Sequence, residues 1–178
     1  MMYSSEQMEE KAIIDTASCM CAAARTAPKA RGNDNIITLV LTGNEKDALA
    51  EKMAEINIRE FEGTSSIFPR DAKNLKSAQA VVLIGVKRVY AGLKFCSFCG
   101  FENCDKCKEA GGRCAYNMID LGIALGSAVS VAADERVDNR IMYSAGKAAA
   151  EMNYADDSIA WHAIPINLSG KNIFFDRK

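Results

Sequence analysis

The chain has 178 residues, 49% of them hydrophobic and 25% charged, and its 22 Lys and Arg against 23 Asp and Glu give a net charge of −1. This length and composition predict a single globular domain over residues 1–178, and the near-balance of charge gives no electrostatic case for binding nucleic acid or an anionic membrane surface. We expect no membrane span, because the apolar runs fall short of roughly 20 residues, and no secretory signal at the glutamate-rich start, so we expect a cytoplasmic protein.

The first half of the chain contains both amphipathic and fully apolar runs. Apolar residues at helical spacing predict helices, and short β-branched runs that are apolar throughout predict strands buried on both faces. Gly63 and Pro69 lie in a stretch rich in turn residues. The predicted elements are a helix over 4–25, a strand over 36–42, a helix over 44–60, a loop over 62–70, a short helix from Asp71 and a strand over 80–86.

Residues 88–115 show neither a helical nor a strand period, and this segment is longer than a plain loop usually reaches. Clustered thiols in a cytoplasmic protein indicate metal ligands rather than disulfides, and metal binding can order a segment that lacks a core. Five of the seven cysteines lie here, at Cys96, Cys99, Cys104, Cys107 and Cys114. We therefore expect a metal-binding insertion at about 88–116.

The last third of the chain predicts two more helices and one strand. Residues 116–133 are apolar and rich in small residues, which favours a central helix, and Gly122 and Gly126 lie on one face of it. A further helix is expected over 137–152 and a third strand over 159–168.

Zinc, a 2Fe–2S cluster and a 4Fe–4S cluster each fit part of the cysteine pattern. Zinc would use the pairs Cys96/Cys99 and Cys104/Cys107, but zinc sites usually separate such pairs by about 12–20 residues. A plant-type 2Fe–2S site fits Cys99, Cys104 and Cys107, although its fourth ligand normally lies further away than Cys114. The compact spacing favours a 4Fe–4S cluster on four of the five thiols. Five unligated thiols in an exposed loop would be a redox liability.

Glycines and phenylalanines surround these cysteines. Gly100, Gly111 and Gly112 allow the positive φ angles that a backbone needs when it wraps closely around a metal. The aromatic side chains that we expect to limit water access to a cluster are Phe95, Phe98 and Phe101.

Several long motifs resemble a family of small prokaryotic ferredoxin-domain proteins of unassigned function. They are AAARTAPKARGNDNI, FPRDAKN, CSFCGFENC, KEAGGRCAYN, DLGIALGSAV, VDNRIMYSAG and GKNIFFDR. The resemblance implies a 4Fe–4S cluster on the ligands Cys96, Cys99, Cys104 and Cys114. Ser97 stands where the family motif often has Gly. Because Cys107 fits none of the four ligand positions, it is either a spare thiol or a rival for Cys104 or Cys114.

The order of elements, with APKARGNDN before the first strand and AIPINLSG at the last, also resembles the flavin-dependent nitroreductases. This resemblance implies an α+β fold, with a mixed sheet flanked by helices, and FMN bound in a homodimer. The arginine-rich phosphate clamp of that family is absent from residues 1–10. In its place, cationic and amide side chains near the AP turn are candidates for the phosphate and for the flavin edge; the alternative is a solvated basic turn. These candidates are Arg25, Lys29, Arg31, Asn33 and Asn35.

Other polar residues carry weaker signals. His162 is the only histidine, and no nucleophile motif accompanies it, so a structural role is the stronger interpretation. Asp120 is a general acid only by conjecture. Lys171 and Arg177 either reach a phosphate in a partner subunit or form a solvated tail.

We interpret the chain as an iron–sulfur redox protein that transfers electrons through a 4Fe–4S cluster, to or from a flavin if one binds. The redox partner would be a protein or a small-molecule electron acceptor. Two alternatives stay open: a non-enzymatic electron carrier or redox sensor, and a zinc-stabilised interaction module.

Overall fold

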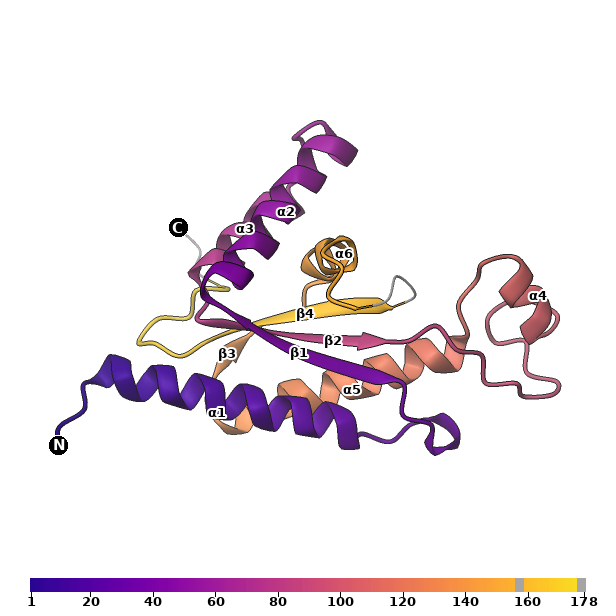
Figure 1. Ribbon diagram of the computed structural model, residues 1–178, viewed down its shortest axis with the longest axis horizontal. Helices are drawn as coiled ribbons and strands as arrows, with labels where there is room; N and C mark the ends of the chain where they lie inside the picture. The colour runs from indigo at the N-terminus through magenta and orange to yellow at the C-terminus, as the bar shows by residue number, and fades with distance from the viewer. Residues whose placement is uncertain (156–158, 176–178) are drawn as a thin grey trace.

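The computed structural model describes residues 1–155 and 159–175 and has an α+β architecture (Figure 1). Its helices are α1 (Ser5–Thr26), the short 3-10 helix η1 (Ala30–Gly32), α2 (Gly43–Phe61), α3 (Ile67–Ser77), α4 (Cys104–Glu109), α5 (Ala115–Asp134) and α6 (Tyr143–Glu151). Its strands are β1 (Ile36–Thr42), β2 (Ala80–Val86), β3 (Asp138–Asn139) and β4 (Ala160–Asn167). The predicted strands over 36–42 and 80–86 are confirmed at their predicted bounds.

The strands form one sheet in the order β1-β2-β4-β3. A mixed sheet was expected, but each pairing among the described residues is antiparallel, with Ile36 opposite Val86 and Ala80 opposite Ile166. The connections explain this difference for β1 and β2. Two successive helices, α2 and α3, join these strands, whereas a single crossover helix is what makes neighbouring strands parallel.

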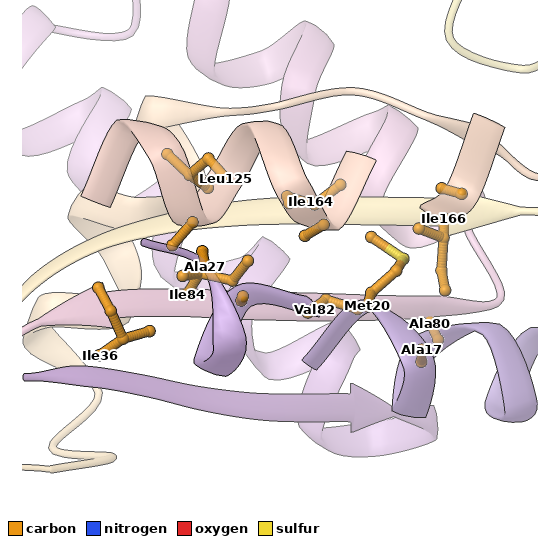
Figure 2. Close-up of a cluster of buried hydrophobic side chains, with 14 of the residues drawn as sticks. Ala17, Met20, Ala27, Ile36, Ala80, Val82, Ile84, Leu125, Ile164 and Ile166 are labelled. Atoms are coloured by element: carbon orange, nitrogen blue, oxygen red, sulfur yellow. The ribbon is translucent and has the colours of Figure 1, made fainter. Parts of the chain in front are cut away.

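Helices cover both faces of the sheet, with α1 and α5 on one side and α2, α3 and α6 on the other (Figure 1). Strand β2 is buried along its whole length, and its side chains alternate between two hydrophobic cores. Val82 and Ile84 meet Met20 of α1 and Leu125 of α5 in the first core (Figure 2). Leu83 belongs to the second core, on the side of α2, α3 and α6.

Local hydrogen bonds explain where two helices begin. Ser4 and Gln7 form a capping box at α1, in which the Ser4 hydroxyl accepts the Gln7 N–H at 3.3 Å and the Gln7 amide oxygen accepts the Ser4 N–H at 3.0 Å. Helix α3 begins at Ile67, so the loop predicted there is too long. The Ser65 hydroxyl accepts the Ile67 N–H at 3.2 Å, and Pro69 falls in the first turn, where a backbone donor has no helical partner.

The prediction of a helix over 137–152 is wrong in its first part. Strand β3 occupies this stretch, and Met142 pairs with Ala163 of β4, whose carbonyl accepts the Met142 N–H at 2.8 Å. Because the sheet edge satisfies this backbone, helix α6 begins only at Tyr143.

Helix α5 is long and apolar enough to cross a membrane by length and composition, so the expectation that no apolar run reaches that length is wrong. Its small apolar residues also suit a core, and Leu121, Ala124 and Ala128 are buried against α1 and the sheet.

Candidate metal centre and the pocket beside it

Five of the seven cysteines lie in a segment that projects from one end of the sheet (Figure 1). The chain leaves the body after Val86 and returns at the start of α5, and we call residues 87–114 the cysteine lobe. Its helix is the short α4, which begins where the Asn103 side chain accepts the Lys106 N–H at 2.9 Å. The lobe lies between β2 and α5, the place at which the sequence predicts a metal-binding insertion.

All five cysteines of the lobe line one cavity, although they are spread over nearly the whole segment. They are Cys96, Cys99, Cys104, Cys107 and Cys114. The cavity is closed on other sides by Tyr90, Phe101 and Ala115. The five thiols therefore lie around one cavity, and their role as metal ligands stays a prediction.

Cys107 is the most deeply placed of these thiols, with no exposed surface, and Cys114 at the start of α5 is 5% exposed. Burial raises the pKa of the Cys107 thiol, and a hydrogen bond with Cys99 and the nearby charges of Cys114 and Cys104 raise this pKa further. The Cys107 sulfur belongs to the same cavity lining as the other four thiols. A metal that bound it would have to displace its proton.

The backbone of the lobe takes several left-handed conformations. Gly100 and Gly111 have φ angles of 82° and 67°, as the sequence predicts. Gly112 differs, because close packing rather than a positive φ requires glycine there. A Cβ atom at this position would lie 2.8 Å from the Phe101 ring and 2.9 Å from the Cys107 sulfur.

The phenylalanines cover the cavity less than expected. Phe101 lines it, but Phe95 is fully exposed and Phe98 is 70% exposed. Phe98 packs against Tyr116 of α5, with 5.7 Å between the ring centroids. Two large aromatic side chains therefore face solvent on the lobe.

The donor chemistry of the cavity fits an iron–sulfur cluster, because four thiolates each bind a separate iron atom of a cubane. Within residues 1–155 and 159–175, no three Cys, His, Asp or Glu side chains converge on a point where a single metal ion would bind. The cavity holds about 20 Å³, which is room for roughly one water molecule. Seating a cluster would therefore require the thiol side chains and the lobe to move outward.

A second, more polar cavity of about 280 Å³ adjoins the first, and we call it the polar pocket. Its walls come from the turn after α1, the start of the cysteine lobe and the first two turns of α5. Tyr90, Ala91 and Cys114 line both cavities. The metal-binding candidates and the polar pocket thus share a wall.

Three of the five residues predicted for flavin binding line this pocket: Arg31, Asn33 and Asn35. Arg31 also donates to the Ala91 carbonyl at 2.6 Å, which ties the AP turn to the lobe. The remaining two lie among the described residues but outside those that line the pocket. The Arg25 side chain forms an ion pair with Asp34, and the Lys29 ammonium group donates to the Ala27 carbonyl at 2.8 Å.

Helix α5 contributes polar residues to the pocket that the sequence reasoning missed or undervalued. Asn117 is 3% exposed, and Asp120 is 7% exposed and accepts the Ala30 N–H at 2.9 Å. Cys114, Asn117 and Asp120 are three residues apart, so they share one face of the helix. Two polar residues on the same face of an otherwise apolar helix were the signal available in the sequence.

His162 lies half-buried in β4, and its Nδ1 atom has no hydrogen-bond partner among the described residues. Burial lowers the pKa of His162. It lines a separate cavity with Arg113 and Lys147. Arg177 lies outside the described residues.

Comparison with known proteins identifies sequence relatives. A family model described as "Uncharacterized protein containing a ferredoxin domain" matches residues 110–177. An uncharacterized protein of Archaeoglobus fulgidus is 38% identical over 185 residues, which cover 99% of this chain and 98% of that protein. Identity of this degree over both lengths implies a common fold.

Solved structures of nitroreductases share that fold. A Lactococcus lactis nitroreductase in complex with nicotinic acid has a TM-score of 0.60 and 15% identity, over 98% of this chain and 86% of that one. A Desulfovibrio desulfuricans nitroreductase in complex with FMN has a TM-score of 0.59 and 13% identity, over 92% and 78% of the two chains. The predicted nitroreductase-like α+β fold is therefore confirmed.

Proposed function

We propose that this chain, which belongs to the family of uncharacterized proteins containing a ferredoxin domain, is a redox protein that passes electrons between a 4Fe–4S cluster and an organic electron acceptor. The cluster would be held by the cysteine lobe and the acceptor by the polar pocket. The observation that supports this proposal is the wall that the two cavities share, formed by Tyr90, Ala91 and Cys114.

For the cluster we propose the ligands Cys96, Cys99, Cys104 and Cys114, the set that the family resemblance implies. A 4Fe–4S cluster supplies one-electron transfer when it is bound. The lobe would place it beside the pocket, and its backbone amides near the thiols would tune the potential. Cys107 then serves as a small buried side chain against which Gly112 packs.

For the acceptor we propose FMN, as in the structurally similar nitroreductase from Desulfovibrio desulfuricans. A flavin exchanges single electrons with a cluster and electron pairs with a substrate. Arg31, Asn33 and Asn35 would contact it, and Arg25 and Lys29 would add positive charge to the same turn. We further propose a cytoplasmic homodimer that exchanges electrons with a partner protein or a small molecule.

The test is the iron and flavin content of protein purified without oxygen. We expect about four iron atoms and one flavin per chain, with visible absorption and an EPR signal that appears on reduction. Stoichiometric zinc, no iron and no EPR signal would refute the proposal and favour a zinc-stabilised module. A cluster without flavin in repeated preparations would favour a carrier or redox sensor.

A further inference from the structure

The side chain of Asn117 is the buried polar group that the structure leaves least explained. Its amide nitrogen and its oxygen are both shielded from solvent, and neither has a hydrogen-bond partner in the described part of the chain. Native proteins rarely leave both halves of a buried carboxamide unpaired, so a missing partner is expected. Asn117 lines the polar pocket, so a turn of its side chain toward the cavity would bring both atoms to a molecule bound there.

The surroundings of Asn117 are held in place by other contacts. The neighbouring Asp120 accepts the Ala30 N–H, which fixes the turn after α1 against helix α5. Tyr90 donates its hydroxyl to the Gly112 carbonyl at 2.9 Å, so its ring forms a positioned wall of the pocket. Tyr116, which packs against Phe98, forms another part of the wall. Aromatic walls of this kind suit a flat ring system.

We infer that Asn117 recognises the ligand of the polar pocket through a pair of hydrogen bonds to a lactam or imide edge of a heteroaromatic ring. A carboxamide presents one donor and one acceptor side by side, and a lactam or imide edge presents the matching acceptor and donor. With little water at the Asn117 atoms, such a pair would be strengthened, and a ring without the matching groups would be rejected. This inference rests on the proposed function, because it assigns the ligand class of the same pocket.

The test measures binding of lumiflavin and of 3-methyl-lumiflavin to the full chain, by flavin fluorescence under anaerobic conditions. Methylation at N3 removes the imide donor and leaves the ring system otherwise intact. In the wild type we expect methylation to weaken binding about tenfold or more. In Asn117→Ala we expect lumiflavin to bind about tenfold more weakly, and the two flavins to differ by less than about twofold. Asn44→Ala, at an exposed position on α2, serves as the control and should behave as the wild type.

The comparison between the two flavins separates recognition from a general structural effect. If Asn117→Ala proves unstable, Asn117→Leu, which keeps a side chain of similar size but has no hydrogen-bonding group, should likewise lose the discrimination. If N3-methylation weakens flavin binding equally in the wild type and in the Asn117 variant, the inference is overturned and the proposed function is left intact. The same holds if the Asn117 variant loses iron but binds both flavins as the wild type does. A wild type that holds neither flavin nor iron would refute the proposed function itself.

Discussion

In the α+β body, which is the chain outside the lobe, every residue of the central strand β2 is buried, whereas in the fully described cysteine lobe, residues 87–114, only Cys107 and Cys114 are buried. The body has two hydrophobic cores and a continuous ladder of strand pairs to order it. The lobe has one short helix and several left-handed backbone positions. The body can therefore fold by burial of apolar surface, and we propose that the lobe depends on what its thiols bind.

The two regions also differ in charge. The lobe contains six Lys and Arg and three Asp and Glu, a net charge of +3, so the remainder of the chain carries −4. The exposed rings of Phe95 and Phe98 lie in this basic region. Exposed aromatic side chains are enriched where proteins dock, and a positive surface attracts a negative one, so we propose that a redox partner with an acidic surface docks on the lobe.

The largest effect is expected from removing a proposed cluster ligand. Cys114→Ser should lower the iron content roughly tenfold or more, because a hydroxyl is a poor replacement for a thiolate on iron. Amide hydrogen exchange should then speed up throughout the lobe and stay slow in β2. Cys107→Ala is the matched variant, since it removes the other buried thiol, and it should retain iron. Loss of iron in Cys107→Ala together with retention in Cys104→Ser would replace Cys104 by Cys107 in the ligand set.

The second largest effect is expected on the free energy of unfolding, which should fall when a side chain of the body is truncated but hardly change when one of the lobe is. Leu83→Ala, in the middle of β2, should lower the free energy of unfolding by about 2–5 kcal/mol, because it leaves a cavity in a closely packed core. Phe95→Ala, in the lobe, should change it by less than about 0.5 kcal/mol. Urea unfolding followed by far-UV circular dichroism measures both. Similar losses in the two variants would contradict a division into a packed body and a metal-dependent lobe.

A smaller effect is expected on electron exchange with an acidic partner. Reduction of the reconstituted protein by a reduced acidic ferredoxin should slow as salt is added, because screening weakens the attraction to the basic lobe. The double variant Lys94→Glu/Lys108→Glu should be about tenfold slower at low ionic strength in stopped-flow measurements. Lys11→Glu, which makes the same kind of charge reversal at one exposed position of α1 outside the lobe, is the control. Rates that respond to neither salt nor charge reversal would exclude the lobe as the docking surface.

The smallest effect concerns His162 in the body. Burial holds its pKa below the ordinary value of 6.5, so the unfolded chain binds a proton at a higher pH than the folded protein. The free energy of unfolding should therefore be highest above about pH 6.5 and decrease as the pH falls through the folded pKa. His162→Gln should flatten this dependence between pH 7 and 5, as measured by urea unfolding at several pH values. An unchanged slope in the variant would assign the pH dependence to other groups.

The sequence predicted strands β1 and β2 well, since both are short apolar runs whose ends are marked by a change in residue type. Local side-chain hydrogen bonds were harder to foresee, and Ser65 begins helix α3 earlier than the turn residues around it indicate. The start of α6 could not be predicted from helical periodicity, because Met142 is held by Ala163 of a distant strand.

The sequence predicted which types of side chain form the candidate site better than it predicted which elements bring them together. The spacing of the cysteines indicated that they would gather, and the AP turn supplied Arg31, Asn33 and Asn35 to the pocket. The part played by α5 depends on Asp120 meeting Ala30, a contact between residues 90 positions apart. No local pattern specifies a contact over that separation; the sequence showed that Asn117 and Asp120 share a helix face, but not that this face meets the turn after α1.

The wall that the two cavities share has a consequence for how such a protein can change over evolutionary time. Tyr90, Ala91 and Cys114 cannot be replaced to suit one cavity without altering the other. A descendant that exchanged its lobe for a shorter loop would open the pocket to solvent as well. We therefore expect the thiols and the pocket residues to be inherited together, so that homologues without the cysteines should also have a different residue in place of Asn117.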